Sequence, residues 1–401
     1  MPTNKKRPII VIGTGSVGVR LVNELLFRQP GACIKVFGGE DQLPYSRENL
    51  SKLLSGEVSK DSLYSKSKIH ESKDVRMYTN NPIVSIDANK QEVTDTEGDV
   101  HVYAQLILAV GSSPRMIDIE GTDLNNVFTF RNIKDAELLK TRQIGSRRTV
   151  VIGGGLVGLD AAYAMNQHST DVVVIESSTR LMSQLLDDHA SVYLRLFLDD
   201  LGIDVRTQSN VARIEGERKV KQVVLADGEV ISCDTVIISI GIIPNTDLAE
   251  SAGLKVNQGI VVDDQLQTSK KNIYAVGECA EHRGRVYAIV QPGFDQASVL
   301  ARRISGGKAK YTGTITSSVL GVVEYPVISI GENGDSKDSK EVMYRDIKRM
   351  VYRKLVLKGG RLHGVIATGP WRQGETMHER VEKKQTVWPW QRKHFEKTGQ
   401  L

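Results

Sequence analysis

The sequence predicts an α/β fold, because two glycine fingerprints each follow a short apolar run and precede a helix-like stretch. The fingerprints are GTGSVG at residues 13–18 and GGGLVG at residues 153–158. A GxGxxG pattern gains its meaning from this strand-to-helix context. The chain therefore reads as two Rossmann-like dinucleotide-binding units, followed by a C-terminal α/β module.

The three glycines of each fingerprint have separate roles. The first allows the tight turn, the second lets the backbone approach a pyrophosphate, and the third lets the helix pack on the strand. They are Gly13, Gly15 and Gly18 in the first copy and Gly153, Gly155 and Gly158 in the second. Two such sites predict two dinucleotides, which we interpret as a flavin that receives electrons from a nicotinamide. The alternative is two glycine-rich turns in an ordinary α/β protein.

Composition limits the class of protein. The 401 residues are 40% apolar and 25% charged, as in globular proteins of two or three domains. No apolar run approaches the length of a membrane helix, and the basic N-terminus has no cleavage pattern, so we expect a cytoplasmic protein without a signal peptide. The net charge of +5 does not argue for nucleic acid and would suit an acidic partner protein.

Cysteine and histidine usage argues against several kinds of site. Cys33, Cys233 and Cys279 are the only cysteines and form no CxxC, which excludes a redox disulfide of that type. A metal or iron–sulfur site with four cysteine ligands within this chain is excluded as well. The histidines of the C-terminal region show no metal-ligand spacing, so no metal site is predicted.

The first unit begins with an expected strand at 8–12, a helix at 16–28 and a strand at 33–38. The second strand leads to Glu40, which lies 22 residues after Gly18, near the distance at which an acid meets a ribose hydroxyl. An exposed loop carboxylate is the alternative for Glu40. We further expect a helix near 47–55, antiparallel strands from 83 to 93, and a buried strand that ends at Gly111.

The second unit repeats this plan with a strand at 149–152, a helix at 156–167 and a strand that ends in Glu176. Glu176 lies 18 residues after Gly158, where an acid accepts the 2′-hydroxyl of NAD and repels the extra phosphate of NADP. We therefore expect NADH to be preferred over NADPH. Further expected elements are strands at 204–213 and 220–225, a buried strand at 235–240 before Gly241 and a helix near 292–305.

Five motifs in this order resemble the pyridine nucleotide-disulfide oxidoreductase superfamily over residues 7–370. Besides the two fingerprints, they are LPYSR with LSK at 43–52, AVG at 109–111 and YAVGECA at 274–280. The subgroup that the chain resembles lacks a redox disulfide and includes rubredoxin and ferredoxin reductases. It also includes the flavin portion of NADH-dependent nitrite reductases, which is most similar around Gly277–Gly284.

The resemblance implies two interleaved domains and two cofactors. FAD would bind a discontinuous domain of residues 1–113 and 243–312, and NAD a domain inserted at 114–242. The sequence pattern itself predicts the C-terminal module over residues 313–370, with strands at 318–323, 327–330, 350–357 and 362–368. Residues 371–401 would form a basic, aromatic tail.

The resemblance also assigns roles to side chains. Arg47 and Lys52 would lie beside the flavin, with Lys52 near its reactive face, or Lys52 is a solvated helix lysine. Glu278 would contact the ribityl chain, where most relatives carry Asp. Asp160 replaces a family Glu that faces both rings, or it is a carboxylate stabilised by the helix N-terminus. The candidate catalytic residues are Lys52 and Asp160, and the candidate cofactor-binding residues are Gly13, Gly15, Gly18, Glu40, Arg47, Lys52, Gly111, Gly153, Gly155, Gly158, Glu176, Gly241, Gly277 and Glu278.

Two further residue types narrow the chemistry. Peroxidases and NADH oxidases of the superfamily place a redox cysteine between the positions of Tyr45 and Lys52, and this chain has none there. Direct transfer from flavin to an external acceptor is therefore expected. Cys279 reads as a small buried residue. His282 reads as a structural histidine, with a position facing the flavin or a partner as the alternative.

The tail holds all three tryptophans, at positions 371, 388 and 390, and carries six Lys or Arg against three Asp or Glu from His378 to Lys397. It is either a docking arm, for a partner protein or a second copy of the chain, or a segment that packs back on the module. A membrane-surface arm is a weaker alternative, because Pro389 is expected to interrupt any amphipathic helix there.

Three functions follow. The first is an NADH-dependent reductase of a small electron-transfer protein such as rubredoxin or ferredoxin. The second is the reductase subunit of a nitrite reductase-like or monooxygenase complex, since the chain ends without the cysteines that nitrite reduction requires. The third is a flavin-binding interaction protein with little turnover.

Overall fold

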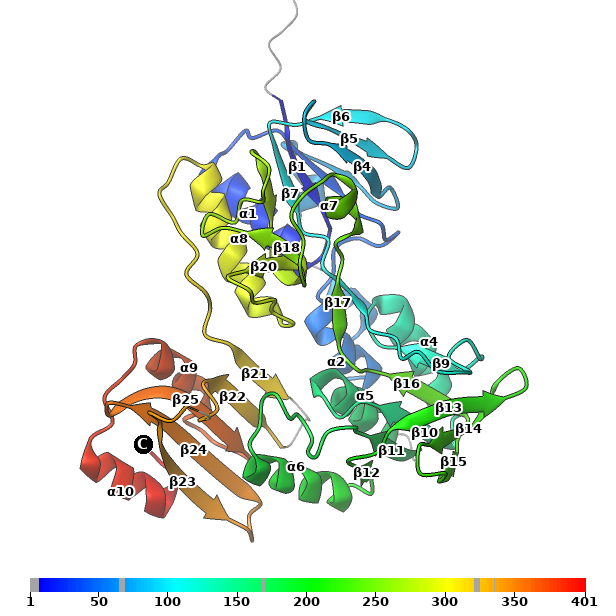
Figure 1. Cartoon of the computed structure of the whole chain (residues 1–401), viewed down its shortest axis with the longest axis vertical. Helices are drawn as coiled ribbons and strands as arrows, with labels where there is room; N and C mark the ends of the chain where they lie inside the picture. The colour runs from blue at the N-terminus through cyan, green and yellow to red at the C-terminus, as the bar shows by residue number, and fades with distance from the viewer. Residues whose placement is uncertain (1–6, 65–68, 168–169, 321–324, 335) are drawn as a thin grey trace, which may run out of the picture. The chain divides into compact units, whose positions relative to one another are not determined.

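The computed structural model describes residues 7–64, 69–167, 170–320, 325–334 and 336–401 (Figure 1). It divides into two compact units. The first unit comprises Met1–Leu50, Val58–Ser113 and Ile242–Thr314, and the second comprises Ser51–Glu57, Pro114–Gly241 and Ile315–Leu401.

The first unit is built on a five-stranded parallel sheet of order β19-β7-β1-β2-β3. Every residue of β1 is buried, because the strand lies in the middle of the sheet with a layer on each face. Helices α1 and α8 pack against each other beside the sheet. The bounds are β1 Ile9–Ile12, α1 Ser16–Arg28, β2 Ile34–Phe37, β3 Val75–Tyr78, β7 Gln105–Leu108, β19 Ile273–Ala275 and α8 Val290–Ile304.

Smaller elements complete this unit. The expected antiparallel sheet is confirmed as β4-β5-β6, and β18 pairs in parallel with β20. The bounds are η1 Arg47–Asn49, α2 Leu50–Leu54 (which passes into the second unit), α3 Lys60–Leu63, η2 Ile69–Glu71, β4 Ile83–Asp87, β5 Glu92–Asp95, β6 Val100–Val102, β8 Ser112–Pro114, β17 Ile242–Pro244, α7 Asp247–Ser251, β18 Ile260–Val262, η3 Gly277–Cys279 and β20 Ala280–His282.

The second unit repeats the parallel sheet, with the order β12-β11-β10-β16-β9, and adds a small antiparallel sheet β13-β14-β15. The bounds are β9 Val127–Thr129, α4 Ile133–Gln143, β10 Arg148–Ile152, α5 Leu156–Asn166, β11 Asp171–Ile175, α6 Asp188–Asp200, β12 Asp204–Arg206, β13 Val211–Gly216, β14 Val220–Leu225, β15 Val230–Ser232 and β16 Thr235–Ile238.

The single strand expected at 204–213 is wrong. The chain leaves the parallel sheet after Arg206 and joins the antiparallel sheet at Val211. The polar residues between them bond to the loop after β11 instead of continuing a strand: the N–H of Gln208 donates to the carbonyl of Ser178 at 2.9 Å. Gln208 also has a φ of 55°, which no strand allows.

The C-terminal module is an antiparallel sheet of order β21-β22-β25-β24-β23, covered by α9 and α10 (Figure 1). The bounds are β21 Ser317–Leu320, β22 Val327–Gly331, β23 Lys340–Asp346, β24 Val351–Lys358, β25 Arg361–Thr368, α9 Gly374–Glu382 and α10 Pro389–Thr398. The strand expected at 318–323 lies partly outside the described residues. The edge strand β23 was not predicted, because it is rich in charge and has one fully buried apolar residue, Val342.

The tail packs back onto this sheet for most of its length. Trp371 and Phe395 lie in the module's core, and Arg353 donates to the carbonyl of Gly399 at 2.9 Å. The prediction that Pro389 interrupts a helix is wrong. Pro389 is the first residue of α10, where a proline costs no hydrogen bond and its fixed φ suits the helix.

Phe395 is fully buried, so its truncation tests whether the tail belongs to the fold. We expect Phe395→Ala to lower the free energy of unfolding by about 3–5 kcal/mol, because a large cavity is left in the core. Chemical denaturation followed by circular dichroism measures this. The control is Trp390→Ala, whose side chain is 64% exposed and whose removal should cost less than about 0.5 kcal/mol. Equal effects of the two substitutions would contradict the packing described.

Candidate functional site

The first glycine fingerprint connects β1 to α1 in the first unit. A Cβ on Gly13 would lie 2.1 Å from the carbonyl oxygen of Ala109, and one on Gly18 would lie 2.2 Å from that of Gly13. Gly13 also has a φ of 122°, which only glycine adopts freely. The backbone is therefore packed as tightly as the fingerprint predicts, and the first turn of α1 is left without a side-chain cap. Its free N–H groups suit a pyrophosphate.

Glu40, Tyr45 and Arg47 gather beside this loop. Arg47 forms an ion pair with Glu40 and donates to the hydroxyl of Tyr45, which donates to Glu40 at 2.8 Å. The guanidinium Nε lies 3.9 Å from the place of a Cβ on Gly15. The structure thus brings two of the predicted residues together with the loop, and Glu40 is a paired carboxylate rather than a free one.

Gly277 and Glu278 lie at the same end of the first sheet. Gly277 has a φ of 83° and its N–H donates to the side chain of Gln296 at 2.7 Å. The carboxylate of Glu278 accepts from the hydroxyl of Ser112 at 2.8 Å, next to Gly111. A Cβ on Gly277 would lie 3.4 Å from Val17 in the first turn of α1. The two predicted segments therefore border one cradle. Gln296 also belongs to this cradle, but the sequence did not indicate it because a single Gln in a helix forms no motif.

Cys279 and His282 follow this segment, and both are buried. Burial raises the pKa of the Cys279 thiol to about 11, so it is protonated and unreactive near neutral pH. His282 is 2% exposed and lies 2.9 Å from the carboxylate of Asp264. Arg283 and His282 hold the pKa of Asp264 at about 2, through hydrogen bonds to its carboxylate.

The second fingerprint repeats the geometry of the first in the second unit. A Cβ on Gly153 would lie 2.2 Å from the carbonyl of Ser239, and one on Gly158 would lie 2.1 Å from that of Gly153. Glu176, at the end of β11, accepts the N–H groups of Gly154 and Ser178, both at 2.7 Å. The predicted carboxylate is therefore fixed at the edge of the second loop, while Gly241 lies in the segment between β16 and β17 with a φ of 110°.

In the second unit, Asp160 on α5 is close enough to Ser51 and Lys52 on α2 for both to act on its charge. Burial raises the pKa of Asp160 to about 6, although a hydrogen bond with Ser51 and the charge of Lys52 lower it in part. The amide of Gln143 holds α2 in place, because it donates to the carbonyls of Leu54 and Ala164 at 3.0 and 2.9 Å. Ser51 and Gln143 were not singled out from the sequence, since their contacts join segments far apart in the chain.

Residues 7–299 match the family model of the pyridine nucleotide-disulphide oxidoreductases, and residues 317–385 match the rubredoxin NAD+ reductase C-terminal domain. The chain belongs to the pyridine nucleotide-disulphide oxidoreductase family. The resemblance and the fold class expected from the sequence are thereby confirmed. Members are FAD- and NAD(P)H-dependent flavoprotein reductases.

The chain is 35% identical over 386 residues to the nitrite reductase [NAD(P)H] of Bacillus subtilis, covering 95% of this chain and 48% of that protein. It is 36% identical over 280 residues to the rubredoxin-NAD(+) reductase of Ectopseudomonas oleovorans, and the match covers 69% of this chain and 72% of that protein. A chain of the solved covalent complex of putidaredoxin reductase with putidaredoxin matches with a TM-score of 0.89 and 25% identity. The match covers 97% of this chain and 96% of that chain. The chain spans about half the length of the nitrite reductase.

In the described part of the chain, each helix is too short or too polar to span a bilayer.

The structure describes three free cysteines. Cys279 and Cys233 are both buried, and burial raises the pKa of Cys233 to about 12. Among the described residues, therefore, the cysteines form no pair that would give this family member a redox disulfide.

The raised pKa of Asp160 predicts a pH dependence of stability. The folded protein holds this proton from the usual 3.8 up to about 6, so wild type loses stability as pH rises through that range. Asp160→Asn should therefore be more stable than wild type by roughly 2 kcal/mol at pH 7.5 and by little at pH 4. Denaturant titrations at both pH values measure it. Asp123→Asn, an exposed acid of the same unit, is the control and should show no such pH-dependent difference.

Proposed function

We propose that this protein is an FAD-dependent NADH oxidoreductase that passes electrons from NADH through FAD to an external carrier such as a rubredoxin or ferredoxin. The observation that carries the proposal is the duplicated glycine cradle, in which backbone fills the space that a Cβ would need in both units. The match of the C-terminal module to the rubredoxin NAD+ reductase family supports a small electron carrier as acceptor.

In this proposal FAD occupies a domain of residues 1–113 and 243–312, and NADH a domain of residues 114–242. The N–H groups at the start of α1 bind the FAD pyrophosphate, while Arg47 and Glu278 border its cradle. FAD supplies a centre that accepts two electrons from a nicotinamide and releases them singly. Glu176 orients the NADH ribose and disfavours a 2′-phosphate.

Asp160 and Lys52 are the proposed catalytic pair. With a pKa of about 6, Asp160 exchanges its proton near neutral pH, which suits a group that balances charge as electrons arrive. Lys52 is exposed and adds a positive charge that favours an anionic reduced flavin. The family Glu at this position has a longer side chain, and the hydrogen bond from Ser51 anchors the shorter Asp160 here.

A second function is the reductase part of a nitrite reductase-like assembly, favoured by the match of 95% of the chain to the Bacillus subtilis enzyme. A monooxygenase system would use the same reductase chemistry. For either system, we propose that the protein works in the cytoplasm, where NADH is available. A flavin-binding interaction protein with little turnover is the remaining alternative.

Anaerobic stopped-flow at the flavin absorbance tests the proposal. Purified protein is mixed with NADH and separately with NADPH, and rapid bleaching by NADH with slow bleaching by NADPH is expected. Protein without flavin, or flavin untouched by either nucleotide, would overturn the reductase function and leave a binding or structural role. Addition of rubredoxin, ferredoxin or a sirohaem-containing partner to reduced enzyme then distinguishes the acceptors.

Glu176→Gln tests the nucleotide preference. Loss of the charge should reduce the preference for NADH over NADPH by roughly tenfold, because a hydrogen bond to a charged group contributes about 1.5–3 kcal/mol. The ratio of kcat/KM for the two nucleotides is the measurement. Glu217→Gln is the matched control, since Glu217 is an exposed acid of the same unit that pairs with Lys221. An unchanged ratio in Glu176→Gln would remove Glu176 from the proposed site.

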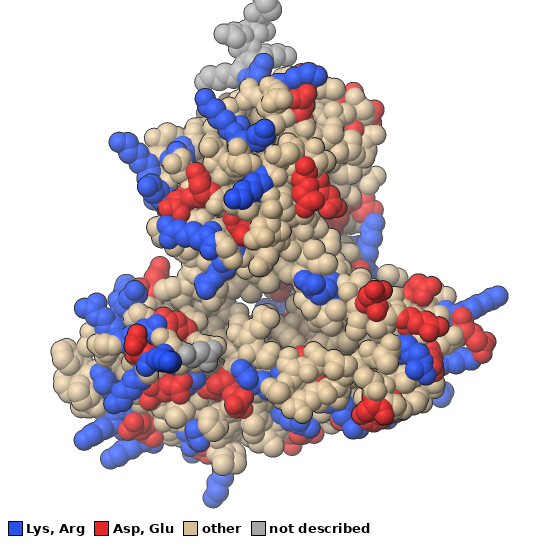
Figure 2. All heavy atoms as spheres, viewed as in Figure 1, with Lys and Arg blue, Asp and Glu red and all other residues tan. Residues whose placement is uncertain are grey.

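The partner surface that we propose lies on the tail. Trp388 and Trp390 stack with ring centroids 5.3 Å apart and are 51% and 64% exposed, although Trp371 is buried. Lys393 and Lys397 of α10 are exposed nearby. On the face shown in Figure 2, Lys and Arg side chains are interspersed with Asp and Glu. An aromatic pair beside a local excess of Lys and Arg suits an acidic carrier protein.

The double variant Trp388→Ala/Trp390→Ala should raise the KM for the carrier by roughly tenfold and leave flavin reduction by NADH unchanged, because interface tryptophans often contribute more than 1 kcal/mol. Steady-state carrier reduction measures it, with Phe27→Ala, an aromatic 82% exposed in the first unit, as the control. A change in molecular mass by light scattering, with carrier kinetics unchanged, would instead assign this surface to a homodimer.

A further inference from the structure

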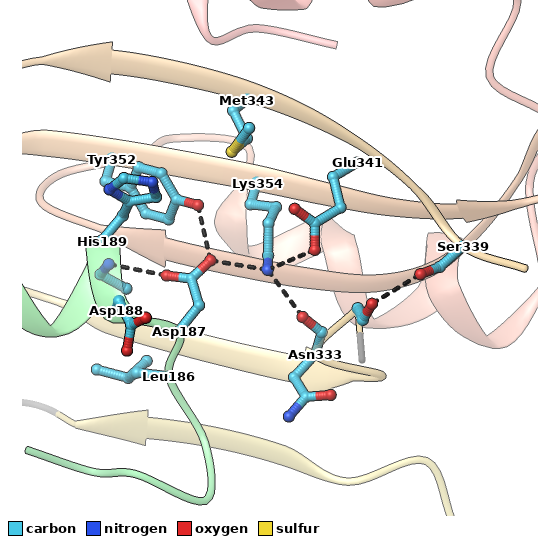
Figure 3. A network of polar contacts seen from close by, with 12 residues as sticks. Leu186, Asp187, Asp188, His189, Asn333, Ser339, Glu341, Met343, Tyr352 and Lys354 are labelled. Carbon is cyan, nitrogen blue, oxygen red and sulfur yellow. Dashed lines mark hydrogen bonds and ion pairs between the residues drawn. The ribbon is translucent and has the colours of Figure 1, made fainter. Parts of the chain in front are cut away.

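Lys354, in the middle of β24, is a lysine buried among polar partners (Figure 3). Its side chain is 3% exposed. The ammonium group lies 2.7 Å from the carboxylate of Asp187 and 3.0 Å from that of Glu341, and it donates to the carbonyl of Asn333 at 2.8 Å. An ammonium has three donors, so every one of them is used. A buried charge this well satisfied holds its partners in one geometry.

Asp187 belongs to the segment that leads into α6, not to the C-terminal sheet. It caps α6 by accepting the N–H of Ala190 at 2.8 Å, and it accepts the hydroxyl of Tyr352 at 2.7 Å. Burial alone would raise the pKa of Asp187, but these bonds and Lys354 hold it below its usual range. The carboxylate therefore stays charged and bound to two residues of the C-terminal sheet.

The sheet holds the same segment at a second point. Ser329, in β22, donates its hydroxyl proton to the carbonyl of Leu185 at 2.7 Å. Arg180 braces the segment from within, because its guanidinium donates to the carbonyls of Ser183 and Leu186, both at 3.1 Å. Residues 180–187 thus form one closed turn that the C-terminal module holds through two strands.

The other end of this turn lies on the second glycine fingerprint. The N–H of Met182 donates to the carbonyl of Gly154 at 3.0 Å. The side chain of Leu181 is so close that a Cβ on Gly154 would lie 2.5 Å from its Cδ2 atom. Gly154 in turn donates its N–H to Glu176. A displacement at Asp187 would therefore reach the loop and the carboxylate proposed to bind NADH.

We propose that Lys354 is a positioning residue of the NADH site, through which the C-terminal module fixes the 180–187 turn against Gly154. This inference rests on the proposed function, since it assigns NADH to the second fingerprint. The C-terminal module would then contribute to nucleotide affinity although none of its residues belongs to the fingerprint.

Lys354→Met tests the proposal in the full-length flavoprotein. The KM for NADH should rise by roughly tenfold while kcat at saturating NADH stays within about twofold, because coupling through such contacts changes affinity without touching the reacting atoms. Calorimetric titration with NAD+ should show the same loss of affinity without turnover. Lys358→Met is the matched control. Lys358 lies on the same strand and pairs with Glu332 at 2.6 Å, away from the turn, so its KM should not change.

A second variant keeps the test decisive if Lys354→Met does not fold. Tyr352→Phe/Ser329→Ala removes two hydrogen bonds to the turn and leaves the lysine in place, and it should raise KM and the NAD+ dissociation constant in the same direction. Affinity equal to wild type in the folded variant, or a fall in kcat alone, would overturn the proposal. If wild type itself binds no NAD+ and is not reduced by NADH, the proposed function fails instead.

A double-mutant cycle separates positioning from general destabilisation. In the Asp187→Asn background, Lys354→Met should raise the NAD+ dissociation constant much less than it does in wild type, because both substitutions break the same link. Effects that multiply independently would show that Lys354 does not act through Asp187, and would also overturn the proposal.

Discussion

The close approach of backbone to backbone at the two fingerprints is the constraint on which the rest of the structure depends. In each unit the first glycine leaves no room for a Cβ beside a carbonyl oxygen, that of Ala109 in the first and Ser239 in the second. Both carbonyls come directly after the neighbouring parallel strand, β7 or β16. This close contact therefore fixes the distance between the ends of the two strands and the position at which the helix starts. The uncapped N–H groups that suit a phosphate result from the same packing.

This constraint explains why the functional elements could be predicted from the sequence. Helix α1 runs over Ser16–Arg28 as expected, and α5 ends one residue before the predicted limit, because the fingerprint, the apolar run before it and the helix pattern after it are all local. Glu176 could be assigned for the same reason, since the length of one helix and one strand fixes its distance from Gly158. The cofactors and the family are confirmed by the comparisons, whereas the individual site residues remain predictions.

The errors arose where the outcome depends on contacts between distant segments. Residues 204–213 read as one strand, yet the loop after β11 captures Gln208 and turns the chain into a different sheet. The edge strand β23 has too few apolar residues to be recognised, although it pairs along its whole length with β24. Pro389 was read as a helix breaker, but its effect depends on position, and at the first residue of α10 it favours the helix. The contacts of Gln143 and Lys354 have no local signature at all.

Two aspartates of the second unit show how partners decide what burial does to a carboxylate. Burial disfavours the charged form of Asp160, and the hydroxyl of Ser51 and the exposed Lys52 stabilise that form only in part. The pKa of Asp160 therefore rises to about 6. Asp187 is buried as well, but a buried ammonium, a backbone N–H and a tyrosine hydroxyl together keep its pKa low. The first therefore changes charge near neutral pH and suits a reaction, while the second keeps its charge and suits a fixed link. A carboxylate with few donors therefore titrates near neutral pH, as the catalytic role proposed for Asp160 requires, and one saturated with donors keeps its charge, as the link proposed for Asp187 requires.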